Sequence, residues 1–358
     1  MGKSNSHSFI NYVCAAYPLL LVRTYEEFRA LSTFVAQLVA QKILNNKGEE
    51  DGAYKAYVWD VVDGVHSLGI SSKNNVLETG AENLEPKTVN NPEAALDFLA
   101  TTAGDNSVLF LKDFHPYFEK DFADRALITR KIRNLVSQFK AQNKVLVFLS
   151  PDMKPPMELE KDTTVVDYKL PDKAELQIVL KGVCHATMAE MPKAKETEAL
   201  LDAALGMTAL EAENAFSVSL VEAKKFDPAI VRREKAAIVK KTGLLEVIET
   251  TETLDQIGGL EIAKEWALTQ KDCFTPEAKA FGLLSPKGVL LNGVAGCGKS
   301  TLAKALAAAF GRPLFRLDMS KIKSKWHGES ESNFRLVLDT VGATAPSILW
   351  ISNSPLAW

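Results

Sequence analysis

Apolar and polar positions follow two alternating patterns along the first 170 residues. Short apolar runs resemble buried strands, and the segments between them repeat apolar positions at helical spacing. Strands are predicted at 18–22, 57–62, 107–112, 144–149 and 163–168, and helices at 24–42, 92–99 and 125–139. Thr24 and Glu27 have capping-box spacing for the first helix. Strands that alternate with helices predict a parallel sheet covered on both faces. The polar stretch 64–91 is predicted to be a surface loop.

From residue 171 to about 247 the apolar spacing is helical and no strand is predicted. Helices are expected at 176–181, 197–205 and 209–221, and a further helix begins at Asp227-Pro228. Thr208 and Glu211 predict a capping box for the third. The last helix carries the basic residues Arg232, Arg233, Lys235, Lys240 and Lys241. We interpret them as a solvated charged face, with contact to an anion as the alternative.

The most specific pattern is a glycine-rich run that follows an apolar segment at 288–292 and precedes a helical pattern at 301–310. Its residues are Gly293, Val294, Ala295, Gly296, Cys297, Gly298, Lys299, Ser300 and Thr301. Strand, glycine-rich loop and helix together predict a phosphate-binding loop, and Gly311 and Pro313 predict where the helix ends.

The chemistry of this loop predicts a nucleoside triphosphate as ligand. The glycines let backbone N–H groups turn toward phosphate oxygens, and the helix N-terminus adds partial positive charge. Lys299 is expected to reach the β- and γ-phosphates, and the Ser300 hydroxyl is expected to bind Mg²⁺. The cofactors predicted from the loop are therefore ATP and Mg²⁺.

Composition narrows the class of protein without deciding it. The chain has 358 residues, a net charge of −3 and 46% hydrophobic residues, which are ordinary values for a globular protein. The near-neutral charge gives no support to a nucleic-acid partner. The four cysteines form no CxxC pair, and no apolar run has the length of a membrane span. We therefore expect a cytoplasmic protein with no membrane partner.

Four segments, in order, resemble the core of AAA-type ATPases. They are Ile257-Gly258-Gly259-Leu260, then Pro286 to Leu291, then the phosphate-binding loop, and finally 325–335, which contains Lys325-Trp326-His327-Gly328 and Gly328-Glu329-Ser330-Glu331. The whole chain resembles the branch of this family found in cyanobacteria, plastids and phages. In that branch a degenerate ATPase-like half precedes one active AAA module. The segments 17–22, 110–115 and 241–245 carry this looser part of the resemblance.

The resemblance implies an α/β fold of the P-loop NTPase (AAA) type in three domains. These are a degenerate ATPase-like domain at 1–170, a helical lid and linker at 171–249, and an AAA core at 250–358. It also implies that Ile257 and Gly258 line the adenine pocket. Lys325, Trp326, His327 and Gly328 would form a pore loop that grips a polypeptide substrate in a homo-oligomeric ring. A buried core tryptophan is the alternative for Trp326, and a helical ion pair with Glu331 is the alternative for Arg335.

The N-terminal half lacks nucleotide-binding residues. After its first strand come Arg23-Thr24-Tyr25-Glu26-Glu27, with no glycine and with carboxylates that would repel a triphosphate. Asp113 ends a strand where an Asp-Glu pair would be expected, but Phe114 follows it. We interpret His115 as structural and this half as a nucleotide-free scaffold.

The AAA pattern breaks at the last strand, 345–351. Ser352 and Asn353 stand where the family has Asp and Glu, which hold Mg²⁺ and activate the attacking water. Loss of a general base slows a reaction by roughly 10² to 10⁴, so we expect hydrolysis to be lost. We also expect a truncated core in which the apolar segment 289–291 lacks neighbouring strands, and a tail at 352–358 from a shifted reading frame.

Three functions stay open from the sequence. The first is a protein-remodelling AAA ATPase, of which this chain is a partial copy. The second is a non-enzymatic scaffold or adaptor whose AAA remnant binds nucleotide weakly or not at all. The third is remodelling of DNA or RNA with Trp326 as a stacking platform, which the near-neutral net charge does not favour.

Overall fold

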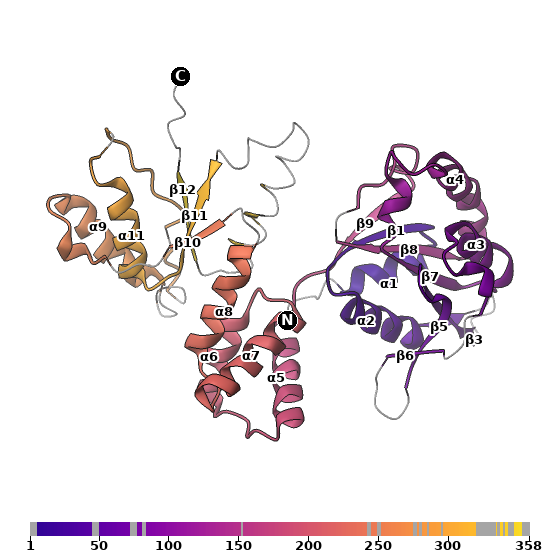
Figure 1. The fold of residues 1–358 in the computed structure, drawn as a ribbon, viewed down its shortest axis with the longest axis horizontal. Coiled ribbons are helices and arrows are strands. Elements are labelled where there is room, and N and C mark those ends of the chain that lie inside the picture. Colours follow the sequence, from indigo (N-terminus) through magenta and orange to yellow (C-terminus); the bar gives the residue numbers. More distant parts are fainter. Residues whose placement is uncertain are drawn as a thin grey trace. The chain divides into compact units, whose positions relative to one another are not determined.

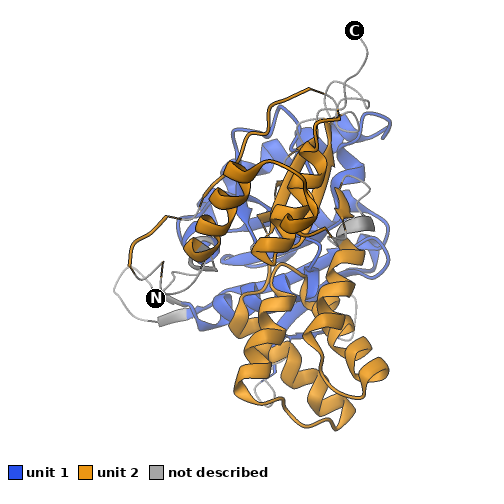
Figure 2. Cartoon of the chain, turned by 90° about the vertical axis from the view of Figure 1, so that its left-hand side faces the viewer, with its two compact units in different colours: residues 1–169 blue, residues 170–358 orange. Residues whose placement is uncertain are grey.

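The structure is a computed structural model that divides into two compact units, Met1–Lys169 (unit 1) and Leu170–Trp358 (unit 2), coloured separately in Figure 2. It describes residues 6–44, 50–71, 77–80, 84–151, 153–241, 245–248, 252–274, 278, 281–284, 286–294, 296–319, 334, 337–338, 341–342 and 347–352. In this part of the chain, no helix has both the length and the apolar character needed to cross a membrane.

A seven-stranded sheet forms the centre of unit 1, in the order β6-β5-β4-β7-β8-β1-β9 (Figure 1). The strands are β1 (Leu19–Arg23), β4 (Lys55–Asp60), β5 (Gly64–Ile70), β6 (Leu77–Thr79), β7 (Ser107–Lys112), β8 (Val145–Ser150) and β9 (Thr163–Asp167). The five strands from β4 to β9 in this order are parallel, and β5 and β6 add an antiparallel edge. The first strand, β1, therefore lies between the fourth and fifth parallel strands in chain order.

Helices cover both faces of this sheet. Successive residues of its strands point to opposite faces, and the residues on both faces are apolar. Leu20 and Val22 of β1 pack with α1 (Ser6–Cys14) and α2 (Glu27–Ala40). Leu19 and Leu21 point to the other face, where they join α3 (Pro92–Asp97) and α4 (Arg125–Ala141). The prediction of a parallel sheet covered on both faces is confirmed.

Smaller elements complete unit 1. A separate two-stranded sheet pairs β2 (Lys42–Leu44) with β3 (Glu50–Ala53). Short helical turns lie at η1 (Pro86–Thr88), η2 (Phe98–Thr102) and η3 (His115–Phe118).

Two predictions for unit 1 are wrong. The segment 64–91 is not simply a loop, because it contains β5 and β6. Val65 and Leu68 of β5 are buried although His66 and Ser67 interrupt the apolar pattern. Thr24 does not cap α2: its hydroxyl accepts a hydrogen bond from the Glu26 amide at 2.9 Å, and Glu26 is the residue before the helix.

Unit 2 begins with four helices around their own core. They are α5 (Lys173–Thr187), α6 (Ala194–Ala204), α7 (Ala209–Ala223) and α8 (Pro228–Lys241). The capping box of Thr208 and Glu211 is confirmed. Arg233 on α8 pairs with Glu222 and Glu234, at 2.7 and 2.9 Å, which fits the interpretation of a solvated charged face. Lys235 departs from that interpretation, because its amine is largely buried and donates to the Leu205 carbonyl.

The rest of unit 2 holds a three-stranded sheet, β10-β11-β12, and two longer helices (Figure 1). The strands are β10 (Leu245–Ile248), β11 (Leu314–Asp318) and β12 (Ile348–Ser352), with β10 antiparallel and β12 parallel to β11. The helices are α9 (Glu261–Lys271) and α11 (Lys299–Phe310), with turns η4 (Leu254–Gln256) and η5 (Asp272–Phe274). The start of β10 at Leu245 corrects the prediction that no strand precedes about residue 247.

The strand predicted at 288–292 is not formed. These residues have no assigned secondary structure, and Leu290 is 92% exposed. A lone strand leaves its backbone groups without ladder partners, so apolar character alone does not hold it in an extended sheet. The segment nevertheless leads directly into the glycine-rich loop.

Candidate functional site

The glycine-rich loop reaches the N-terminus of α11 through two residues with left-handed backbone. Gly296 has φ +81°, and Gly298, the residue before the helix, has φ +84°. A side chain would strain the backbone at both positions, which explains why glycine stands there. The helix then begins at Lys299, and its first N–H groups face the loop as an anion site requires.

The Lys299 ammonium folds back over its own loop. Its Nζ donates to the carbonyl oxygens of Gly293 and Val294 at 2.7 and 2.6 Å, and it lies 3.5 Å from Cys297 Sγ. A bound triphosphate would compete for this ammonium, because phosphate oxygens accept stronger, charge-assisted hydrogen bonds than a neutral carbonyl does. The loop is thus tied together by the residue expected to bind the ligand.

The residues expected to bind Mg²⁺ and the nucleotide are accessible. Ser300 and Thr301, in the first turn of α11, are exposed, as is Val294 in the loop. Mg²⁺ keeps several waters and is often held by few protein ligands together with substrate phosphates. A single hydroxyl beside an open helix N-terminus therefore suits a metal that arrives with the nucleotide. Ala295 lies outside the described residues.

Ile257 packs against α11, the helix that follows the glycine-rich loop. Its side chain is 8% exposed and packs in one cluster with Ala267 of α9 and with Leu302 and Leu306 of α11. The Ile257 carbonyl also accepts a hydrogen bond from the Lys264 ammonium. Gly258, beside it, is exposed. The structure thus brings the predicted adenine-pocket segment and the phosphate-binding helix into contact.

Ser352 lies at the end of β12, opposite Asp318 at the end of β11. Its hydroxyl donates to the Leu317 carbonyl at 3.3 Å and accepts from Arg316 Nε at 3.4 Å. A serine hydroxyl cannot take the place of a carboxylate as general base at neutral pH. Asn353 and the predicted pore loop Lys325, Trp326, His327 and Gly328 lie outside the described residues, as do Glu331 and Arg335.

Three family profiles match this chain. The SpoVK-like AAA ATPase, N-terminal domain, matches residues 6–168, and the SpoVK-like AAA ATPase, second domain, matches residues 174–242. The ATPase family associated with various cellular activities (AAA) matches residues 289–353. That last match contains both the glycine-rich loop and Ser352.

The chain is also similar over nearly its whole length to the AAA domain-containing protein ycf46 of several algae. Identity to the protein of Trieres chinensis is 30% over 348 residues, which covers 96% of this chain and 64% of the relative. For Guillardia theta it is 28% over 341 residues, covering 94% and 62%. Together these matches support an AAA-type ATPase that resembles the ycf46 proteins. It spans less than two thirds of the length of these curated relatives.

Unit 1 has the strand order expected around a phosphate-binding loop, but different chemistry at that position. The sequence after β1 leads into α2 through Glu26 and Glu27. Lys112, at the end of β7, lies 3.9 Å from Glu27 and 3.7 Å from Asp60, at the end of β4. A phosphate-binding loop has its lysine after the first strand; here Glu26 and Glu27 stand after that strand, and the lysine that lies near Glu27 belongs to the end of β7.

Burial and neighbouring charges act in opposite directions on Glu27. Burial raises the pKa of its carboxyl, Lys112 lowers it, and Asp113 and Asp60 raise it further. The cavity that Glu27 and Lys112 line has a volume of about 210 Å³, below the roughly 300 Å³ at which small-molecule pockets begin. Sequence reasoning found the carboxylates but missed Lys112, because their pairing joins segments far apart in the chain.

His115 does not form a catalytic relay with Ser150 and Asp113. Ser150 Oγ lies 3.1 Å from Nδ1 of His115, and Asp113 Oδ1 lies 4.0 Å from the same nitrogen. A relay needs the acid and the nucleophile on opposite ring nitrogens. The arrangement favours the interpretation of His115 as structural.

Proposed function

We propose that this chain binds ATP with Mg²⁺ at the loop Gly293–Ser300 and hydrolyses it slowly or not at all. The observation that carries the proposal is the loop itself. Two glycines with left-handed backbone lead into the open N-terminus of α11, and the ammonium of Lys299 lies over the same loop. Backbone N–H groups, the helix dipole and one lysine ammonium are the elements that hold a triphosphate.

The proposal of lost hydrolysis rests on the residue at the end of β12. Ser352 offers a hydroxyl where the family resemblance implies Asp, and Asn353 follows where it implies Glu. Without a general base the rate of hydrolysis falls by roughly 10² to 10⁴, or about 3 to 5 kcal/mol of barrier. ATP would then be a bound ligand and not a substrate for hydrolysis.

The test is ATP binding and turnover by the full chain beside two variants. Lys299→Ala removes the loop ammonium. Lys304→Ala removes a cation five residues further along α11, where it pairs with Glu252 at 2.8 Å. We expect Mg²⁺-dependent binding that only Lys299→Ala abolishes, with no measurable turnover. Turnover that depends on Lys299 would refute the loss of hydrolysis, and absence of binding would refute the nucleotide site.

A second function, a non-enzymatic scaffold or adaptor, is favoured by a different observation. Unit 1 has a complete two-faced core, and the internal ion pair of Lys112 with Glu27 stands where unit 1 would need a phosphate site. In this proposal unit 1 holds a partner and nucleotide is dispensable. Loss of ATP binding in Lys299→Ala would then leave partner binding by the full chain unchanged.

The substrate and assembly are further proposals from the family resemblance. We propose a polypeptide substrate gripped by Trp326 in a homo-oligomeric ring in the cytoplasm, without nucleic acid. The test is sedimentation of the full chain with and without ATP, together with cross-linking of an unfolded polypeptide to wild type and Trp326→Ala. A chain that stays monomeric and cross-links equally after the substitution would contradict the proposal.

A further inference from the structure

A cavity of about 430 Å³ lies in unit 1 beside helix α4. Its volume falls in the range of about 300 to 1,000 Å³ that small-molecule pockets occupy. It lies between the start of α4, the turn before that helix, and the segment after β8. Its polar lining consists of Lys120, Arg125, Thr129, Arg130, Arg133 and Glu158.

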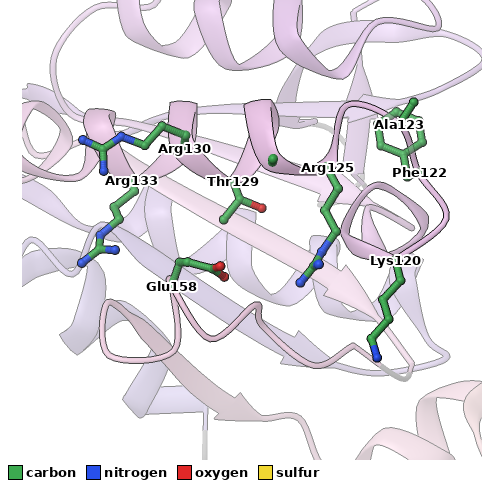
Figure 3. Close-up of a pocket in the computed structure, with 9 residues that line it drawn as sticks. Lys120, Phe122, Ala123, Arg125, Thr129, Arg130, Arg133 and Glu158 are labelled. Carbon is green, nitrogen blue, oxygen red and sulfur yellow. The ribbon is translucent and has the colours of Figure 1, made fainter.

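The cavity is strongly basic in a chain whose net charge is −3. Four of these six side chains are cationic and one, Glu158, is acidic. Figure 3 shows Arg125 and Thr129 projecting from α4 toward the segment that carries Glu158. Arg125, Thr129 and Arg133 recur every four residues and so share one stripe of the helix, about 12 Å long at the rise of an α-helix.

The cations that line the cavity have no carboxylate partner among the described residues, unlike Lys131 elsewhere on the same helix. Within the described residues, no carboxylate lies within 4.0 Å of the charged groups of Lys120, Arg125, Arg130 or Arg133. Lys131 instead pairs with Asp97 at 2.7 Å and with Glu93 at 3.9 Å. Ordinary surface pairing therefore neutralises Lys131 and leaves the cavity charged.

Two buried polar atoms at the cavity have no partner among the described residues. They are Nε of Arg125 and Oγ1 of Thr129, and the Thr129 residue is only 6% exposed. A buried donor left unsatisfied is unfavourable, and proteins rarely keep one without an ion, water or ligand that completes it. A threonine in a helix can usually bond to the carbonyl four residues earlier, but this hydroxyl does not.

We propose that this cavity binds a small ligand that carries a chain of two or more phosphates. Arginine side chains bind phosphate through paired, charge-assisted hydrogen bonds, and three arginines line this one cavity. A stripe of donors along two turns of helix suits a chain of phosphates better than one small anion. The cavity is separate from the loop at 293–300 and is lined by residues of unit 1 alone.

The probe is inorganic tripolyphosphate, with ATP as a second arm, titrated by calorimetry into the full chain carrying Lys299→Ala. That background removes the nucleotide loop of unit 2 from the measurement. We expect saturable binding of tripolyphosphate that Arg125→Met weakens by at least about tenfold. Lys131→Met removes the same charge from the same helix outside the cavity and should change affinity by less than about twofold.

Glu158→Gln gives a test in which the expected result is a gain of binding, so that misfolding of the variant cannot produce it. Removal of the carboxylate that lines the cavity should tighten tripolyphosphate binding by about threefold. ATP binding as tight as tripolyphosphate would identify the phosphate chain as the whole recognition element, and tighter ATP binding would identify a nucleotide. Absence of saturable binding, an equal loss in Lys131→Met, or no gain in Glu158→Gln would overturn the proposal.

Discussion

The Lys112 ammonium at the end of β7 lies 3.9 Å from the Glu27 carboxylate at the start of α2. It also lies 3.7 Å from Asp60, so one cation faces two carboxylates at the carboxyl ends of the strands in unit 1. Ion pairs that stay partly exposed contribute little each, about 0.2 to 1 kcal/mol. Their main effect is on the local electrostatics, because Lys112 offsets the negative charge of Glu27 and Asp60.

Lys112→Met should destabilise unit 1 by up to about 1 kcal/mol at pH 7 and by less at pH 4. Without the cation, the pKa of Glu27 rises further above its ordinary value, because burial, Asp113 and Asp60 all raise it. The folded state then holds a proton that the unfolded state has lost, so stability falls as pH rises from about 4.5 through the folded pKa.

The measurement is urea unfolding followed by the fluorescence of Trp59, which is buried in unit 1, with the chain's other tryptophans replaced by phenylalanine. The double variant Glu27→Gln/Lys112→Met removes the carboxylate as well and should recover most of the stability at pH 7. Equal destabilisation by Lys112→Met at pH 4 and pH 7 would contradict an electrostatic cause.

Lys235 on α8 makes the helical part of unit 2 sensitive to alkaline pH. Burial lowers the pKa of its amine from 10.5 to about 8, and the amine donates to the Leu205 carbonyl at the end of α6. Between those two values the unfolded chain binds more protons than the folded one, so stability rises with pH. The gain relative to a variant without the amine is at most about 3 kcal/mol.

Hydrogen exchange of α6 and α8, compared between wild type and Lys235→Met at matched pH, measures this gain. We expect the protection of wild type to increase relative to the variant from pH 7.5 to pH 10. Lys181→Met, at an exposed lysine on α5, is the control and should show no such trend. A constant difference across the range would mean that the amine titrates alike in both states.

Local patterns predicted most of unit 1 because its parallel strands are buried on both faces. Val108 and Leu109 of β7 enter opposite cores, so the strand is an unbroken apolar run that the sequence displays directly. β5 escaped prediction because it lies toward the edge of the sheet, where His66 and Ser67 remain partly exposed. Its strand character comes from pairing with β4, which single-segment reasoning does not include.

The candidate sites also differ in how far the sequence alone predicts them. The loop at 293–300 is contiguous, and the backbone at Gly298 follows from its own residue type. The ion pair of Glu27 with Lys112 and the unpaired stripe of Arg125 and Thr129 depend on which segments the fold brings together. The charge of a basic residue is visible in the sequence, but the absence of its partner is not. Three-dimensional placement was therefore needed to separate Arg125 from Lys131.

Substitutions at two loop glycines should weaken ATP binding for different reasons. At Gly298, alanine would keep a left-handed backbone that costs an L-residue about 1 to 2 kcal/mol, or roughly five- to thirtyfold in affinity. At Gly293, a Cβ atom would lie 2.7 Å from Cys297 Sγ. The thiol can rotate away, at about 0.5 to 1.5 kcal/mol, so the loss should be roughly two- to tenfold.

Cys297→Ala distinguishes these causes. Combined with Gly293→Ala it removes the clashing sulfur and should restore ATP affinity to within about twofold of the Cys297→Ala single variant. Combined with Gly298→Ala it should restore nothing, because backbone strain is independent of that side chain. Fluorescence titration with an ATP analogue measures wild type, the three single variants and the two double variants. Rescue of Gly298→Ala would show that the loop adopts another backbone.

The apolar segment before the loop should promote self-association of the full chain. Phe281 and Leu284 are each 85% exposed, and Leu290 is 92% exposed. Burying one such side chain contributes about 1.5 to 3 kcal/mol, so Leu290→Ser should weaken association by roughly tenfold or more. The measurement is analytical ultracentrifugation over a range of protein concentrations, with binding of a hydrophobic dye as a second readout.

Leu210→Ser is the matched control, because Leu210 is a 66% exposed leucine on α7 in the helical part of unit 2. Scattered single leucines are normal on protein surfaces, whereas neighbouring exposed apolar residues mark an interaction surface. We therefore expect the control to associate and bind dye like wild type. If both serine variants reduce association equally, a general loss of surface hydrophobicity explains the effect, and the segment at 281–294 has no special role.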